Sequence, residues 1–250
     1  MKLLVLVVCL LSERFLMHSL SYQRFYWFDD YAKRIASTIE KNNYFTNPWL
    51  LLAAIVLPIT LIVAAIYGLL HGIVFGFAGI ILSIVIFFYC LGPVNAFYPI
   101  MDVDTKENTK GIVGSYFAAV NTQLFAPIFW YIMGGPVLVI IYRLITLSQH
   151  ITPVKEEAVQ LTDVFEWIPA RITVLLYLIV GNFQSGFSTF RKYLTAKPDA
   201  NNKMLSDCGL HAVKSDASDD VPMPVAESLV EHATIVLLVF IALFTLVAWM

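Results

Sequence analysis

The stretch WLLLAAIVLPITLIVAAIYGLL, residues 49–70, contains no charged side chain. An α-helix rises about 1.5 Å per residue and the hydrocarbon core of a bilayer is about 30 Å thick, so about 20 apolar residues are needed to cross it. Residues 49–70 therefore predict a membrane-spanning helix. Pro58 lies inside this stretch, where a membrane helix tolerates a bend.

The composition of the whole chain agrees with a membrane environment. Of its 250 residues, 59% are hydrophobic and 14% are charged, whereas soluble domains have about 45–50% and about 25%. We therefore expect the lipid bilayer as a partner. The net charge of −2 and the lack of a basic stripe predict no nucleic-acid partner. The three cysteines, Cys9, Cys90 and Cys208, follow no metal or disulfide spacing, so we predict no metal site.

Further apolar stretches flank the first one. Residues 71–91 follow after a short connection and predict an antiparallel hairpin with 49–70. The other expected spans are 122–144, which Gly134-Gly135-Pro136 interrupts, 168–183 and 232–250. The start, MKLLVLVVCLL, is interpreted as a short retained N-terminal membrane helix, with an uncleaved signal peptide as the alternative. The predicted fold is an all-α, multi-pass membrane protein with about four to six membrane segments.

Polar segments separate these stretches. Residues 20–48 mix aromatic and charged side chains, which predicts an amphipathic helix at the membrane surface. Residues 193–228 are polar, and we expect a mobile loop there. The predicted organisation is a helical membrane domain over 1–192, this loop over 193–228 and a C-terminal transmembrane helix over 229–250.

Lysine and arginine placement predicts the orientation. If every apolar stretch spans, three basic loops share one side: 20–48, 93–121 and the last loop, which contains Arg191, Lys192, Lys197, Lys203 and Lys214. The positive-inside rule places them in the cytoplasm with both termini outside. Alternatively, 122–144 forms two half-length helices that turn back at Gly134-Gly135-Pro136, as broken membrane helices do. Arg143, Lys155 and Arg171 would then lie in the cytoplasm as well.

Charges meet an apolar segment in EWIPARITVLLYLIVGNF, residues 166–183. Proline suits the first turn of a helix, so we expect a helix to begin near Ile168, with Asp163 and Glu166 ahead of its N-terminus, where acids suit the helix dipole. Arg171 either extends to lipid headgroups or pairs with Asp163 or Glu13 in a polar pocket.

Two more charges, Glu13 and Arg14, interrupt the first apolar helix. They either end that helix at the interface, or Glu13 meets a cation such as Arg143 or Arg171. The predicted polar pocket consists of Glu13, Arg14, Arg143, Asp163, Glu166 and Arg171. Nucleotide-binding loops, nucleophile elbows and zinc-protease motifs do not occur in the sequence, so no catalytic residue is predicted.

The stretch FAPIFWYIMGGPVLVIIYRL, residues 125–144, followed by residues 166–183, resembles the AmpE family of bacterial inner-membrane proteins. The residues that carry the resemblance are Pro127, Phe129, Trp130, Gly135, Pro136, Tyr142, Trp167, Pro169 and Gly181. The resemblance implies a protein of the Gram-negative inner membrane without a cofactor. It also implies a modulatory role in β-lactamase induction and cell-wall-linked signalling, with other inner-membrane or cell-wall-recycling proteins as partners.

AmpE proteins are in turn similar to the CobD/CbiB membrane enzymes, which join adenosylcobyric acid to aminopropanol or its phosphate. Their shared segment starts with a pattern similar to E-N-x-x-D-G-x-x-A-P-L-F, and only its second half is present here, as Ala126-Pro127-Ile128-Phe129. The expected acids and amide fall on Ala118, Ala119 and Thr122, and a later aspartate falls on Ser148. Because Mg²⁺–ATP chemistry needs carboxylate or amide ligands, we expect a non-enzymatic protein. A corrinoid amide synthase stays as one alternative, and a small-molecule or lipid transporter, suggested by the Gly-Gly-Pro break, as another.

Overall fold

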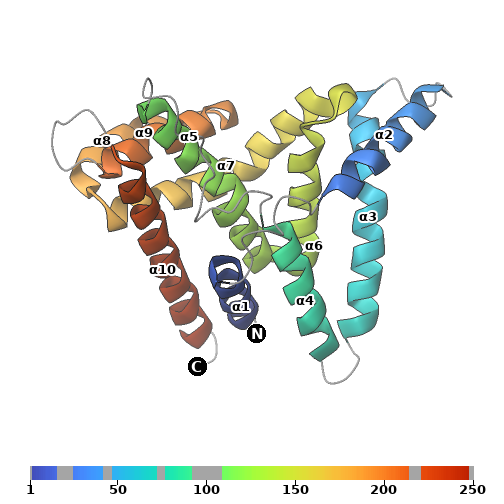
Figure 1. Ribbon diagram of the computed structural model, residues 1–250, viewed down its shortest axis with the longest axis horizontal. Helices are drawn as coiled ribbons and strands as arrows, with labels where there is room; N and C mark the ends of the chain where they lie inside the picture. The colour runs from blue at the N-terminus through green and yellow to red at the C-terminus, as the bar shows by residue number, and fades with distance from the viewer. Residues whose placement is uncertain are drawn as a thin grey trace. The chain divides into compact units, whose positions relative to one another are not determined.

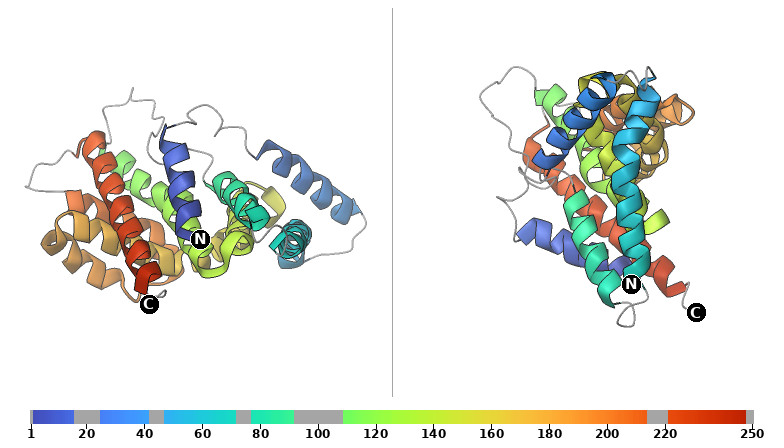
Figure 2. Two further views of the ribbon diagram at one scale, coloured as in Figure 1. Left: turned by 90° about the horizontal axis from the view of Figure 1, so that it is seen from below. Right: turned by 90° about the vertical axis from the view of Figure 1, so that its right-hand side faces the viewer.

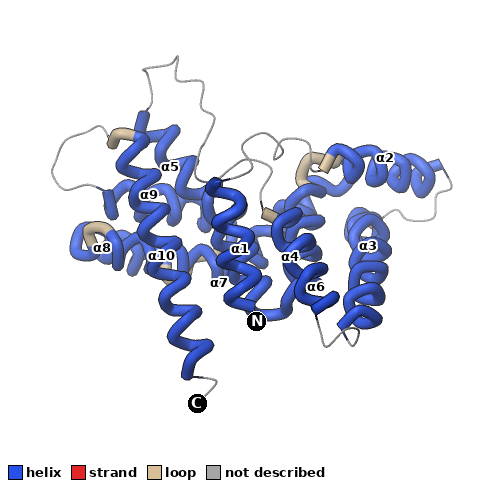
Figure 3. Tube along the Cα trace, turned by 60° about the horizontal axis from the view of Figure 1, so that its bottom comes forward, coloured by secondary structure: helices blue, strands red, loops and turns tan. Residues whose placement is uncertain are grey.

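The computed structural model describes residues 2–15, 25–41, 47–71, 77–91, 109–213 and 221–247. Every regular element in these ranges is a helix (Figure 3). Three helical stretches are long and apolar enough to cross a membrane: Pro48–Leu70, Gly111–Ser148 and Met223–Val247. The predicted all-α, multi-pass membrane fold is confirmed.

The described contacts divide the chain into two compact units. The first comprises Met1–Pro93 and Pro127–Phe165, and the second comprises Val94–Ala126 and Glu166–Met250. The predicted division into 1–192, 193–228 and 229–250 stays a prediction.

The first unit contains the predicted hairpin. Helix α3 (Pro48–His71) lies antiparallel to α4 (Phe77–Cys90), and α1 (Lys2–Phe15) packs against α4 (Figure 1). The amphipathic helix expected within 20–48 is α2 (Tyr26–Lys41). Its apolar residues Phe28, Ala32 and Ala36 recur at helical spacing and are buried against α3, whereas Lys33 and Arg34 are exposed.

Helix α6 (Ala126–Ser148) is broken at the Gly-Gly-Pro sequence, as predicted. Gly135 has φ 68° and ψ −155°, a backbone conformation that essentially only glycine adopts. Helix α6 (Figure 1) is kinked at this residue, and Pro136 follows as the first residue of the second arm, where its fixed φ is favourable.

Pro136 has no N–H group, so the Ile132 carbonyl four residues earlier loses its usual helical donor. Lys2 of α1 replaces this donor, because its Nζ donates a hydrogen bond to the Ile132 oxygen at 2.7 Å. The N-terminal helix thereby stabilises the break.

The second unit is built around α5 (Thr109–Val120), which continues through a π-helical turn, Asn121–Phe125. Helix α9 (Asn201–Val213) packs against α5 and against α8 (Phe183–Tyr193), and α10 (Met223–Val247) contacts α5 and α9 (Figure 2). The short 3-10 turn Pro198–Ala200 leads into α9. A second 3-10 turn, Thr152–Val154, belongs to the first unit and precedes α7.

Helix α7 corrects one expectation. It runs from Lys155 to Val180, so it does not begin near Ile168, and Pro169, Asp163 and Glu166 lie inside it. The acids of its first turn are Glu156 and Glu157. A proline interrupts only one backbone hydrogen bond, and tertiary packing of both helix faces outweighs this loss.

The prediction of a mobile loop over 193–228 is wrong at residues Asn201–Val213, because these residues form helix α9. Met204, Leu205, Cys208 and Ala212 recur at helical spacing and are buried. This apolar stripe, short but regular, outweighs the polar composition around it. Residues 214–220 lie outside the described residues. The C-terminal helix begins at Met223, ahead of the expected span 232–250.

We expect Gly135→Ala to lower the free energy of unfolding by about 1–3 kcal/mol, because alanine is strained at this backbone conformation. Gly68→Ala is the matched control. A Cβ atom at either glycine meets nothing within 4 Å, but Gly68 lies inside regular helix α3, where alanine is favoured by up to about 1 kcal/mol. Thermal unfolding in detergent measures both, and equal effects of the two substitutions would contradict the strained break.

Candidate functional site

Arg171 of α7 lies at the centre of the second unit with 8% of its surface exposed. A guanidinium has five N–H donors, and here all five donate to carbonyl oxygens. Nε donates to Leu194 O at 3.0 Å, Nη1 to Trp167 O at 2.7 Å and Asn201 Oδ1 at 3.2 Å, and Nη2 to Tyr193 O at 3.2 Å and Ala196 O at 3.0 Å.

The Trp167 ring completes this cage. The guanidinium carbon lies 3.9 Å from the ring centroid, a cation–π contact. The indole Nε1 also donates to Ala196 O at 3.1 Å. Trp167 and Arg171 are four residues apart, so one face of α7 presents both.

The geometry makes Arg171 a cap for the C-terminus of α8. The last carbonyls of a helix lack internal donors and carry partial negative charge, and Tyr193 and Leu194 provide two of them. The carboxylate or headgroup partner that the sequence suggested for Arg171 is therefore replaced by carbonyl oxygens.

Arg143 plays a similar part in the first unit. It is buried, and its Nε donates to Cys90 O, the last residue of α4, at 2.7 Å. Its guanidinium carbon lies 5.9 Å from the ring centroid of Tyr142, which is fully buried. Arg143 and Arg171, which lie in the two stretches that carry the family resemblance, thus each contact the C-terminal carbonyl groups of another helix.

A buried chain of polar side chains joins another face of α7 to the π-helical turn. Thr173 Oγ1 donates to Asn121 Oδ1 at 2.9 Å, and Asn121 Nδ2 donates to Glu166 Oε2 at 3.1 Å. All three residues are buried. The π-helical turn begins at Asn121, and such turns often occur at functional sites. Sequence reasoning missed Asn121, although an amide within an apolar run is a usable signal.

The six residues of the predicted polar pocket fall into two groups. Glu13 and Arg143 are buried in the first unit, where Asp163 is partly exposed, and the side chain of Arg14 lies outside the described residues. Glu166 and Arg171 are buried in the second unit. Their grouping into one pocket stays a prediction.

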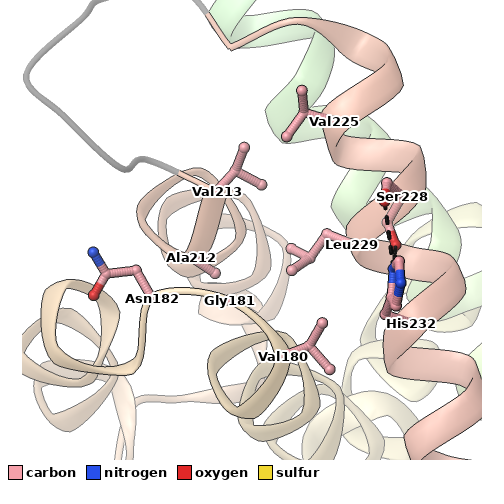
Figure 4. A pocket seen from close by; sticks show the side chains of 9 residues that line it. All are labelled: Val180, Gly181, Asn182, Ala212, Val213, Val225, Ser228, Leu229 and His232. Atoms are coloured by element: carbon pink, nitrogen blue, oxygen red, sulfur yellow. Dashed lines mark hydrogen bonds between the residues drawn. The ribbon is translucent and has the colours of Figure 1, made fainter.

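Gly181 has a steric role. A Cβ atom on it would collide with the carbonyl oxygen of Ala212, so only glycine permits this approach of α7 to the end of α9. The next residue, Asn182, donates its N–H to Ala212 O at 2.7 Å and caps α8 by accepting from Ser185 N at 3.1 Å. A pocket of about 480 Å³ opens beside these residues, and Val225, Ser228, Leu229 and His232 of α10 form its other wall (Figure 4).

Aromatic packing surrounds other motif residues. Trp130 lies 5.2 Å from the ring of Phe129 and 4.9 Å from that of Phe165. Pro127 occupies the first turn of α6 and is buried.

Helices α8 and α9 are joined by a 2.8 Å hydrogen bond from Tyr193 Oη to Asp207, which raises the pKa of Tyr193. Burial raises the pKa of the Cys208 thiol to about 12, so it is unsuited to nucleophilic chemistry near neutral pH.

A second pocket, of about 570 Å³, lies between α5 and α9, and we call it the α5–α9 pocket. The residues that line it are Gly111, Gly114, Ser115, Ala118, Ala119, Thr122, Gln123, Asn202 and Ser206. None of these side chains is ionisable. Helices α5 and α9 can approach closely because Gly114 and Gly209 have no Cβ atom. A Cβ atom on Gly114 would collide with Ser206, and one on Gly209 would collide with Phe117.

The sequence model of one protein family, described as regulatory signalling modulator protein AmpE, matches residues 99–249 of this chain. The chain belongs to the AmpE family. It is a membrane protein of a regulatory family, and the resemblance inferred from residues 125–144 and 166–183 is confirmed.

More distant similarity extends to cobalamin biosynthesis proteins. The chain is 31% identical over 108 residues to the probable cobalamin biosynthesis protein CobD of Pyrococcus furiosus, covering 40% of this chain and 36% of that protein. It is 25% identical over 88 residues to CobD of Pelobacter propionicus, covering 32% and 27%. The matches thus span about a third of these relatives. No solved structure matches the chain.

We expect Arg171→Met to lower the free energy of unfolding by about 1–3 kcal/mol, because Leu194 O and Asn201 Oδ1 each lose a charged donor, whereas Ala196 O keeps Trp167 Nε1 and Tyr193 O keeps the Ala196 N–H. Arg191→Met is the control. Arg191 is an exposed cation in the last turn of α8, the helix that Arg171 of α7 caps. Its loss should therefore cost less than about 1 kcal/mol. Amide hydrogen exchange should show faster opening of α8 in Arg171→Met alone, and equal exchange in both variants would refute the capping role.

Proposed function

We propose that this protein is a non-enzymatic modulator of the Gram-negative inner membrane that acts in β-lactamase induction and cell-wall-linked signalling. Family membership supports a regulatory membrane protein. The observation that carries the non-enzymatic part is the lining of the α5–α9 pocket.

The α5–α9 pocket contains the three positions at which the synthase-like pattern has its charged and amide ligands. Ala118, Ala119 and Thr122 all line it. An ATP-dependent ligase needs Mg²⁺ between phosphate oxygens, held by carboxylates or amides at such positions. The methyl groups of Ala118 and Ala119 cannot coordinate Mg²⁺. The hydroxyl of Thr122 is neutral, so it cannot supply the negative charge of a carboxylate ligand.

The pocket itself remains open, although its ligating groups are replaced. Its remaining polar groups are the hydroxyls of Ser115, Thr122 and Ser206 and the amides of Gln123 and Asn202. Such groups bind neutral polar ligands by hydrogen bonds. A site of this kind suits recognition of a signal molecule rather than phosphoryl or acyl transfer.

Gene deletion tests the proposed role directly. In a host that carries this gene and an inducible β-lactamase, we expect deletion to change the induced enzyme level and the wild-type gene to restore it. We expect an Ala119→Leu variant, which fills the α5–α9 pocket, to fail in restoration. Ala65→Leu, which adds the same volume at an exposed position of α3, should restore. Unchanged induction after deletion would remove the basis of the proposal.

The second candidate function is a corrinoid amide synthase, which the similarity to the CobD proteins favours. Purified protein incubated with cobyric acid, ATP, Mg²⁺ and aminopropanol should form no amide under conditions in which an authentic synthase is active. Amide formation above a heat-inactivated control would replace the modulator by the synthase.

A further inference from the structure

Helices α2 and α3 of the first unit enclose a groove of about 400 Å³, which we call the α2–α3 groove. Tyr31, Arg34, Ile35 and Thr38 recur at i, i+3, i+4 and i+7 along one face of α2, and Ala54 of α3 forms the opposite wall. Tyr31 Oη donates to the Ile55 carbonyl at 3.3 Å, which fixes one side of the groove.

Arg34 is the one cation that lines this groove. Its side chain is exposed, and its guanidinium has no hydrogen bond or ion pair with any residue that the structure describes. Arg143 and Arg171, by contrast, are buried against carbonyl oxygens. The donors of Arg34 are therefore available to a ligand.

The contacts of α2 place the groove near a membrane–water boundary. Its buried face lies against Leu51, Leu52 and Ile55, near the start of the candidate span Pro48–Leu70. At the C-terminal end of α4, Trp27 Nε1 donates to Tyr89 Oη at 2.6 Å. The start of α3 and the end of α4 lie at one end of their antiparallel hairpin (Figure 1), where tryptophan and tyrosine are enriched in membrane proteins.

An apolar surface continues from the groove along α3. Ala54, Leu57 and Leu61 lie on one face of the helix, and Leu57 and Leu61 are 54% and 65% exposed. Seven residues of helix extend about 10 Å, so this face offers a path into the hydrocarbon region.

We propose that the α2–α3 groove binds one anionic phospholipid, with its phosphate at Arg34 and an acyl chain along Ala54, Leu57 and Leu61. A mostly apolar groove lined by one cation, which has no ion-pair partner among the described residues, fits an amphiphile with one negative charge. Arginine is suited to this contact because its planar donors match phosphate oxygens. The inference depends on the membrane fold and is independent of the proposed modulatory function.

Native mass spectrometry of the purified full chain in detergent tests the proposal, with phosphatidylglycerol and phosphatidylcholine of identical acyl chains as the probes. We expect phosphatidylglycerol to bind more tightly. Arg34→Gln should weaken its binding roughly tenfold, the loss typical of a charge-assisted hydrogen bond, and leave phosphatidylcholine binding unchanged. Arg34→Lys, which keeps the charge but loses the planar pair of donors, should bind phosphatidylglycerol with an affinity between those of the wild type and Arg34→Gln.

Two further variants complete the design. Lys33→Gln removes an exposed cation one residue away that does not line the groove, and it should change the affinity less than about twofold if attraction is local to the groove. Ala54→Phe fills the groove without changing charge and should weaken both lipids. Circular dichroism and gel filtration establish that each variant keeps the wild-type helix content and size.

Several results would overturn the proposal. Equal losses in Arg34→Gln and Lys33→Gln would indicate general attraction to a charged surface. Equal affinity for the two lipids would exclude an anionic headgroup as the determinant. Displacement of phosphatidylglycerol by glycerol phosphate at matching concentrations would indicate an anion site without an acyl chain. A dimer that Ala54→Phe dissociates would identify a second copy of the chain as the occupant.

Discussion

Backbone carbonyl groups at helix ends and breaks impose the main constraint on this structure. In an apolar environment, a carbonyl without a donor costs far more than it does in water, because no solvent replaces the missing hydrogen bond. The chain meets this constraint with long cationic side chains. Arg171 serves the end of α8, Arg143 serves the end of α4, and Lys2 serves the carbonyl that Pro136 leaves unpaired. Each contact joins two different helices, and those of Arg143 and Lys2 span 53 and 130 residues of sequence, so satisfying the backbone also determines the packing.

Small residues determine how closely the remaining helices approach. Gly114 and Gly209 allow α5 and α9 to touch, and Gly181 allows the end of α7 to reach α9. In lipid, such close approach is a principal source of helix association, because burying apolar side chains gains little. The α5–α9 pocket lies along the same small-residue face. Ala118, Ala119 and Thr122 line this pocket, so its chemistry depends on side chains next to the close helix contact and not on the glycines that permit that contact.

Composition and apolar length were sufficient to predict the helical membrane fold, the hairpin of α3 and α4, the surface helix α2 and the break at Gly135. These features depend on local patterns, which one sequence displays. The start of α7 could not be predicted from Pro169, because the packing that keeps the helix continuous comes from distant residues. Helix α9 was missed because its stripe of Met204, Leu205, Cys208 and Ala212 is short and lies within a polar segment. The partners of Arg171 were missed for a related reason: backbone carbonyls leave no mark in the sequence.

The hydrogen bond between Lys2 and Ile132 joins residues 130 positions apart. Synthesis proceeds from the N-terminus, at about 5–20 residues per second, so Lys2 emerges many seconds before its acceptor exists. An ammonium group remains stable in the interim only in water or among headgroups. The charged end of α1 is therefore expected to stay at a polar surface until the Gly-Gly-Pro segment has been synthesised. Helices α1 and α6 cannot make this contact earlier, whatever the speed at which each helix forms.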